Sequence, residues 1–161
     1  YLKINVIDSD YNIYNNYTMS LPKKYTAKLN RKDEIKQERA LNRSRKAYRT
    51  KRGKQRYYSR PKLSSFKERK SSWTQKFKKQ YPNAKSIKEI SKATGIPENA
   101  LKAVKRKGMG AYYSSGSRPN QTAHSWGLAR MSSYIMGGKT RNVDKAITDK
   151  YNVTFKHQSK Y

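Results

Sequence analysis

Two histidines, His124 and His157, are the side chains of this sequence available as bases at neutral pH. Neither belongs to a Ser-His-Asp arrangement, and no pair of carboxylates is spaced for acid–base catalysis. No cluster of metal ligands is visible, and the absence of cysteine excludes cysteine-rich zinc sites. His124 stands at the start of an expected helix beside Trp126, where a histidine is more often a packing or capping residue. The sequence predicts no enzyme, metal site or cofactor; a nucleic-acid-processing enzyme would need His124 or Tyr113.

Residues 137–140, GGKT, resemble the end of a phosphate-binding loop, whose pattern is G-x-x-x-x-G-K-[ST]. That pattern places its first glycine where this chain has Ser133, and it follows a strand. The residues before GGKT have the pattern of a helix instead. We therefore interpret the four residues as a helix stop followed by a cap.

The stronger chemical signal is charge, because 39 Lys and Arg face 10 Asp and Glu and give a formal net charge of +29. Self-repulsion of this size opposes a compact state unless an anionic partner neutralises it. Nucleic acid, an anionic membrane surface and an acidic protein face are the candidates. Most of the charge lies between residues 23 and 85.

Aromatic residues are interleaved with the cations of this basic segment. Lys and Arg can neutralise phosphates while aromatic rings stack on bases. The same composition fits an acidic groove between protein subunits, with Arg60 among the cations that pair with carboxylates. Trp73, Phe77 and Tyr81 recur at i, i+4 and i+8 on one helix face, either as a core-facing stripe or as an anchor on a partner. Residues 43–56 also resemble a nuclear localisation signal.

Residues 90–108, ISKATGIPENALKAVKRKG, have the spacing of a helix-turn-helix, with Gly95 in the turn. In a DNA-reading unit, Glu98, Asn99 and Lys102 would lie near base edges. A packed helical hairpin requires the same spacing, and Glu98 would face phosphate unfavourably. Both interpretations stay open at this stage.

The stretch 108–144 holds six of the eight glycines of the chain. This density predicts a loop of fixed shape that leads into a short helix. We expect Trp126 in the core of the domain. The expected cationic surface around the loop is formed by Arg118, Arg130, Lys139 and Arg141.

Local signals predict the elements that position these residues. Asn30 caps a helix over about 31–52 whose apolar stripe is too thin to bury much surface, so we expect it to face solvent or lie along a partner. Extended chain follows over 56–70. A second helix begins at Ser71 or Ser72 and ends at Pro82, and a third begins at Ser86 with a Glu89 capping box and ends at Gly95. A fourth begins at Pro97 and ends at Gly108. The last two begin near Thr122 and at Asn142, and they end at Gly137 and beyond Ile147.

The predicted fold class is mainly α. We expect an N-terminal strand-like segment at 1–22, a basic arm with one or two cationic helices at 23–85, and a small helical domain at 86–161. The domain would contain a helical hairpin, the glycine-rich loop and two further short helices. No apolar run approaches the length needed to cross a bilayer.

The sequence from residue 94 to 145 resembles an uncharacterised domain found in proteins of large double-stranded DNA viruses and of some tailed phages. Members of that family commonly have Gly-His-Arg-Pro-Gly where this chain has residues 116–120, GSRPN, so a role for that histidine does not carry over. Segments 21–25 and 44–72 resemble the basic region that often precedes the domain. The matching residues are Thr94, Gly95, Ile96, Pro97, Gly108, Ala111, Gly116, Arg118, Pro119, Trp126, Ala129, Arg130, Gly138, Lys139 and Asp144.

This resemblance implies a virion structural protein, present in the host cytoplasm or nucleus during assembly. The leading expectation is a minor capsid (cement) protein that bridges major capsid subunits on the inner side of the shell. Its partners would be the major capsid protein and other minor capsid proteins, with packaged DNA or an anionic inner membrane surface nearby. The alternative is a virion protein that binds and neutralises packaged DNA, through the helix-turn-helix or the basic arm.

Overall fold

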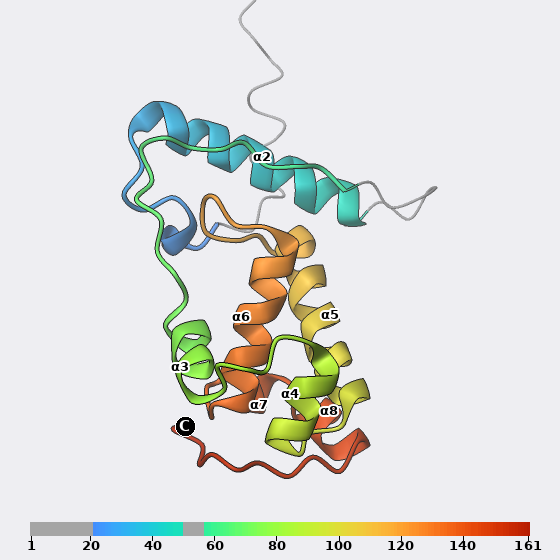
Figure 1. The fold of residues 1–161 in the computed structure, drawn as a ribbon. Helices are drawn as coiled ribbons and strands as arrows, with labels where there is room; N and C mark the ends of the chain where they lie inside the picture. The colour runs from blue at the N-terminus through green and yellow to red at the C-terminus, as the bar shows by residue number, and fades with distance from the viewer. Residues whose placement is uncertain (1–20, 50–56) are drawn as a thin grey trace, which may run out of the picture.

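The computed structural model describes residues 21–49 and 57–161 of the chain. In these two ranges the protein forms seven α-helices and a short 3-10 helix, and no strand (Figure 1). This confirms the mainly α class. The predicted N-terminal strands lie in residues 1–20, outside the described residues.

The centre of the fold is a pair of packed helices, α5 (Glu98–Ser114) and α6 (Ala123–Ile135). Helix α3 (Ser72–Gln80) packs on α6, and α4 (Ile87–Thr94) packs on α5 (Figure 1). Burying a large apolar side chain stabilises a fold by about 1.5–3 kcal/mol, so this small core is its main support. The core residues are Phe77, Ile90, Ile96, Ala100, Leu101, Val104, Met131, Tyr134, Ile135 and Val153.

Side-chain caps begin α3, α4 and α6 where the sequence predicted them. The Ser86 hydroxyl accepts from the Glu89 backbone N–H at 3.2 Å, and the Glu89 carboxylate accepts from the Ser86 backbone N–H at 2.8 Å. Thr122 and Ser125 form the same reciprocal pair at the start of α6. Gly95 ends α4 with a φ of 78°, a left-handed conformation that favours glycine.

The prediction that a helix ends at Gly108 is wrong, because α5 continues through Gly108 to Ser114. Gly108 lies against Gly127 of α6, and a β-carbon built on Gly108 would lie 2.8 Å from the Gly127 Cα. The glycine therefore permits a close approach of two helices. Consequently, the first part of the predicted glycine-rich loop is helical.

The prediction of a single last helix capped by Asn142 is also wrong. The structure has two short helices, α7 (Thr140–Val143) and α8 (Lys145–Lys150), with Asn142 inside the first. Asp144 separates them and is fully buried. The helix stop at Gly137 is confirmed, since α6 ends at Ile135 and Gly137 has a φ of 83°.

Helix α2 (Arg31–Arg49) packs across the C-terminal end of α5, and the segment 57–70 runs beside it without a helix or strand (Figure 1). Leu41 of α2 is fully buried, and Leu63 of the neighbouring segment is 1% exposed. The start of α2 agrees with the prediction, as the Asn30 side chain accepts from the Asp33 backbone N–H at 2.9 Å. Much of the basic segment thus has packing partners inside the chain.

Candidate nucleic-acid interface

The loop between α5 and α6, residues 116–120, is the point where the basic segment meets the helical domain. Gly116 has a φ of 110°, and a β-carbon there would lie 3.0 Å from the Tyr25 ring and 3.2 Å from the Leu41 side chain. Glycine is therefore required both by the backbone conformation and by the space. Tyr25 and Leu41 are both buried, so this contact fixes the loop against η2 (Lys23–Tyr25) and α2.

Arg60, in the 57–70 segment, also connects the loop after α5 to α2. Its guanidinium lies 3.9 Å from the centre of the Tyr112 ring and donates to the Ser117 hydroxyl at 2.6 Å. It also donates to the Tyr112 carbonyl and, at 3.5 Å, to the Ser44 hydroxyl. Burial lowers the pKa of Arg60. A guanidinium with this many intrachain acceptors serves the fold, and its contact with a partner stays a prediction.

Asn120 closes the other side of the loop. Its amide nitrogen donates to the Leu63 carbonyl at 3.0 Å, and its side-chain oxygen accepts from the Leu63 backbone N–H at 2.8 Å. Asn120 has a φ of 56°, a left-handed conformation that asparagine adopts more readily than most residues. Gln37 donates to the Ser117 carbonyl at 3.2 Å, so α2 and the 57–70 segment hold the loop from both sides.

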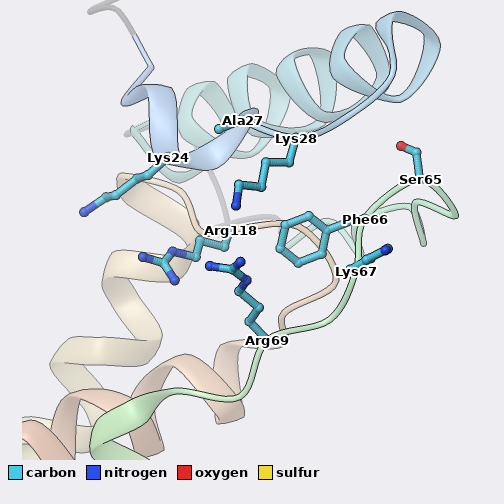
Figure 2. Close-up of a pocket in the computed structure, with 8 residues that line it drawn as sticks. All are labelled: Lys24, Ala27, Lys28, Ser65, Phe66, Lys67, Arg69 and Arg118. Atoms are coloured by element: carbon cyan, nitrogen blue, oxygen red, sulfur yellow. The ribbon is translucent and has the colours of Figure 1, made fainter.

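This fixed loop leaves Arg118 exposed. Ser117 before it is fully buried, and Pro119 after it is among the fully buried side chains. The buried neighbours therefore fix the point at which the Arg118 side chain leaves the loop. In Figure 2 the Lys28 and Arg69 side chains end near the Phe66 ring, while the Arg118 side chain extends from its loop toward the side of Lys24.

We call this space the basic pocket. It has a volume of about 400 Å³ and opens to solvent between η2, the 57–70 segment and the loop after α5. Ala27, Ser65 and Phe66 line it with five cations and no carboxylate. The five cations of the basic pocket are Lys24, Lys28, Lys67, Arg69 and Arg118.

The carboxylate that contacts Ser65 of the pocket wall is already occupied by hydrogen bonds. Asp33 is buried and accepts hydrogen bonds from the backbone N–H of Ser65 at 3.0 Å and from its hydroxyl at 2.7 Å. These bonds from Ser65 hold the pKa of Asp33 below its ordinary value. Asp33 thus positions the pocket wall, while the facing cations keep their charge for an anion.

One backbone conformation in the pocket is unusual. Lys28 has a φ of 69°, where residues other than glycine, asparagine and aspartate are uncommon. Such conformations cluster at functional sites, where the surrounding structure holds them. The turn directs the Lys28 side chain into the basic pocket (Figure 2).

The aromatic stripe predicted on α3 lies mainly against the protein itself. Phe77 is a buried core residue, and the Tyr81 hydroxyl lies 2.8 Å from Nε2 of His157. Trp73 is half-buried and packs against Gly138, where a β-carbon would lie 2.9 Å from its ring. The core-facing interpretation is thus confirmed for Phe77, while a partner contact of this stripe stays a prediction.

The cations predicted around the glycine-rich stretch divide into two kinds. Arg130 makes a bidentate pair with Asp144 at 2.7 and 2.8 Å, and Arg141 donates to three backbone carbonyls at 2.7–2.9 Å. Lys139 is exposed, with its amine 4.9 Å from the Tyr161 ring centre. Arg118 and Lys139 are therefore the two whose charged groups remain at the surface.

Trp126, expected in the core, lies outside the central cluster and is half-buried. Its ring makes an edge contact with Tyr25, with the ring centres 6.2 Å apart. It therefore joins α6 to the basic segment.

The predicted helical hairpin is present as α4 and α5. Ile90, Ile96 and Leu101 are buried between the helices, while Asn99 and Lys102 are exposed. An ion pair of 3.1 Å links Glu98 to Lys102. The geometry agrees with a packed hairpin, and DNA reading by its second helix stays a prediction.

No group of three or more potential metal ligands occurs in the described part of the chain. Within those same ranges, no helix has the length and apolar character needed to cross a membrane. His124 is exposed near the start of α6, and His157 pairs with Tyr81.

Sequence reasoning found Arg118 but missed the cations that surround it. Lys24 and Lys28 lie about ninety residues before Arg118 in the sequence, and Lys67 and Arg69 lie in an extended segment. The packing of Tyr25, Leu41 and Leu63, together with the hydrogen bonds of Gln37, Arg60 and Asn120, brings these segments together. The interleaving of aromatic residues with cations was the available signal, and it included Phe66.

Residues 22–153 match the model of a family described as "Family of unknown function (DUF5824)". No curated protein and no solved structure matches the chain. The matched residues include both the basic pocket and the α5–α6 pair.

Proposed function

The chain belongs to this family of unknown function, and we propose that it binds nucleic acid by neutralising phosphates with the basic pocket and the surrounding cationic surface. One observation carries the proposal. Five cations from three separate segments line one pocket without a carboxylate, and the fold holds the backbone beneath them. Bringing like charges together is unfavourable, so a polyanion is the partner that stabilises this arrangement.

Several carboxylates of the described residues support this choice, because groups within the chain already hold them. Asp33 is held by Ser65, Asp144 by Arg130 and Lys107, and Glu98 by Lys102. With 39 basic and 10 acidic side chains in the sequence, such pairs leave a large excess of positive charge. Nucleic acid supplies phosphates at the density that this excess requires.

The minor capsid function is our second proposal, and it depends on the resemblance of residues 94–145 to proteins of large DNA viruses. In that setting the chain would bridge major capsid subunits beside other minor capsid proteins, near packaged DNA or an anionic inner membrane surface. This proposal also requires a basic arm with too few apolar residues to fold without a partner. Because Leu41 and Leu63 are buried inside the chain, its support is weaker than that for nucleic-acid binding.

Fluorescence anisotropy with DNA of mixed sequence, over a series of salt concentrations, tests the first proposal. The logarithm of the association constant is expected to fall linearly with the logarithm of salt concentration, with a slope of about −0.9 for each phosphate neutralised on duplex DNA. The absence of salt-sensitive binding at moderate ionic strength would contradict it. A strong sequence preference would instead favour the helix-turn-helix, and location in the shell of an intact particle would favour the capsid proposal.

A further inference from the structure

We infer that the basic pocket receives one unstacked nucleotide of single-stranded nucleic acid, with its base on the Phe66 ring and its flanking phosphates on the surrounding cations. This inference rests on the proposed function and narrows it to one form of nucleic acid and one site. It uses Phe66, which has no other evident role in the fold.

The position of Phe66 is the first argument. Its side chain is half-buried on the pocket wall and lies outside the hydrophobic core cluster. Within the described residues it has neither an aromatic partner nor a cation placed over its ring. The backbone beneath it is fixed by a hydrogen bond from the Phe66 N–H to the Leu63 carbonyl at 3.4 Å. A flat ring held on a cationic wall is a stacking surface for a base.

The arrangement of charge is the second argument. Lys24 and Lys28 come from one side of the pocket, Arg69 from the other, and Arg118 from the loop between them (Figure 2). Phosphates on both sides of a bound base would therefore meet cations. The volume of about 400 Å³ falls within the range of sites that hold small organic groups, about 300–1,000 Å³.

The form of nucleic acid follows from access to the base. In a duplex each base is stacked between its neighbours, so its face is closed to a protein side chain. In a single strand a base can turn out and lie on an aromatic ring. A duplex would contact only the rim of the pocket through its phosphates. The pocket should therefore add affinity for single strands beyond what charge alone provides.

An acidic protein segment would use the same cations, but it would gain little from the flat face of Phe66. Carboxylates pair best with arginine forks. Only Arg69 and Arg118 among the five cations could provide such forks. The ring thus favours a nucleotide, and an acidic peptide becomes a competitor in the test.

The experiment compares the wild-type protein with Phe66→Leu, which keeps an apolar side chain and removes the flat ring. Binding of a fluorescent single-stranded oligonucleotide and of its duplex is measured by anisotropy at one salt concentration. We expect Phe66→Leu to weaken single-strand binding by about fivefold to 150-fold, the range of a lost base–aromatic stack, and to change duplex binding less than twofold. Unchanged single-strand binding, or equal loss for both forms, overturns the inference.

Charge is tested by a matched pair of variants. Arg118→Gln removes a pocket cation, and Lys79→Gln removes the same charge from the exposed face of α3. The Arg118 variant is expected to lose more affinity for the single strand than the Lys79 variant. Equal losses would show that only net charge matters and would overturn the pocket assignment.

A third variant gives a signal from the site itself. Phe66→Trp keeps a stacking ring, so it should retain affinity and show fluorescence quenching on addition of the single strand, beyond that of the wild type. Displacement of the oligonucleotide by an acidic peptide with the same dependence on Phe66 would overturn the inference. If the wild type binds neither form of DNA, the proposed function itself fails. If it binds DNA without dependence on Phe66, only the inference about the pocket fails.

Discussion

Gly108 of α5 and Gly127 of α6 face each other where the two central helices meet. A β-carbon on Gly108 would lie 2.8 Å from the Gly127 Cα, and one on Gly127 would lie 2.8 Å from the Lys105 carbonyl oxygen. Both contacts are with backbone atoms, which cannot move aside as the end of a side chain can. The spacing of the central pair therefore depends on the absence of a side chain at both positions.

Gly108→Ala and Gly127→Ala are each expected to lower the free energy of unfolding by about 1–3 kcal/mol, the usual cost of overpacking. The added methyl groups must push α5 and α6 apart and loosen the core between them. Urea denaturation followed by circular dichroism measures the effect.

Gly110→Ala is the matched control for these variants. It lies in the same helix, and its β-carbon would meet only the Tyr48 hydroxyl at 3.3 Å, the end of a flexible side chain. Alanine in a helix interior is favoured over glycine by about 0.5–1 kcal/mol, so Gly110→Ala should be neutral or stabilising. Equal losses at positions 108 and 110 would contradict the close-approach explanation.

The sequence correctly predicted those helix ends that depend on residues close together in the chain. The Ser86–Glu89 capping box, Thr122 and Gly95 are local signals, and each begins or ends a helix in the structure. Gly108 was interpreted as a helix end because glycine serves both stops and close approaches. The residue that decides between the two, Gly127, lies nineteen positions further along the chain.

The candidate site depended on contacts that no local pattern contains. Leu41 belongs to a helical apolar stripe that looked too thin to bury much surface, and Leu63 is a single apolar residue in an extended basic segment. In the structure they are buried with Tyr25 against the loop that carries Gly116 and Asn120. Arg118 could be identified as a candidate from its place beside glycine and proline, but the cations around it could not.

Asp144 is expected to be the most sensitive charged residue of the domain. It is fully buried and pairs with Arg130 at 2.7 Å and Lys107 at 2.8 Å. Asp144→Asn leaves both cations without their carboxylate, so unfolding free energy should fall by about 3–5 kcal/mol. Asp149→Asn is the control, because Asp149 and its partner Lys145 are exposed, and it should cost less than about 1 kcal/mol. Similar losses for the two variants in thermal denaturation would contradict this assignment.

Stability is expected to fall in acid. Burial raises the pKa of Asp144, but hydrogen bonds and charge from Arg130 and Lys107 outweigh it and hold the pKa below its ordinary value. Hydrogen bonds from Ser65 lower the pKa of Asp33 as well. Such groups add stability that is fully present above the unfolded pKa, about 3.9 for Asp, and is lost as pH falls through the folded pKa. Urea titrations should show this loss below about pH 5, with a shallower dependence for Asp144→Asn.

Substitutions at Arg60 and Arg118 should affect different properties, the first mainly stability and the second mainly DNA binding. Arg60→Met removes the donor to the Tyr112 carbonyl and the Ser117 hydroxyl, so unfolding free energy should fall by about 1–3 kcal/mol. Arg118→Gln changes an exposed side chain, so stability should stay within about 0.5 kcal/mol while the salt slope of DNA binding falls by about 1. Chemical denaturation and salt-dependent anisotropy on both variants give the comparison, and a reversed pattern would contradict the assigned positions.

Whether helix α2 is folded without a partner distinguishes the two proposed functions. Leu41 is fully buried beside Gly116, and the Gln37 amide donates to the Ser117 carbonyl, so α2 has both apolar and polar contacts with the loop after α5. Hydrogen exchange on the isolated protein is therefore expected to show protected amides along α2 without any partner. An arm that folds only between capsid subunits would exchange rapidly until those subunits were added.

Leu41→Ala shows whether this protection comes from docking. Removal of a buried leucine side chain costs about 2–5 kcal/mol, and the loss should fall first on α2, the helix that carries Leu41. We expect α2 amides to lose protection in this variant while those of α5 and α6 keep theirs. Glu38→Gln, on the same helix and not among its buried residues, serves as the control and should leave the exchange pattern unchanged. Rapid exchange along α2 in the wild type would remove the support that the folded pocket gives to nucleic-acid binding and would favour the capsid proposal.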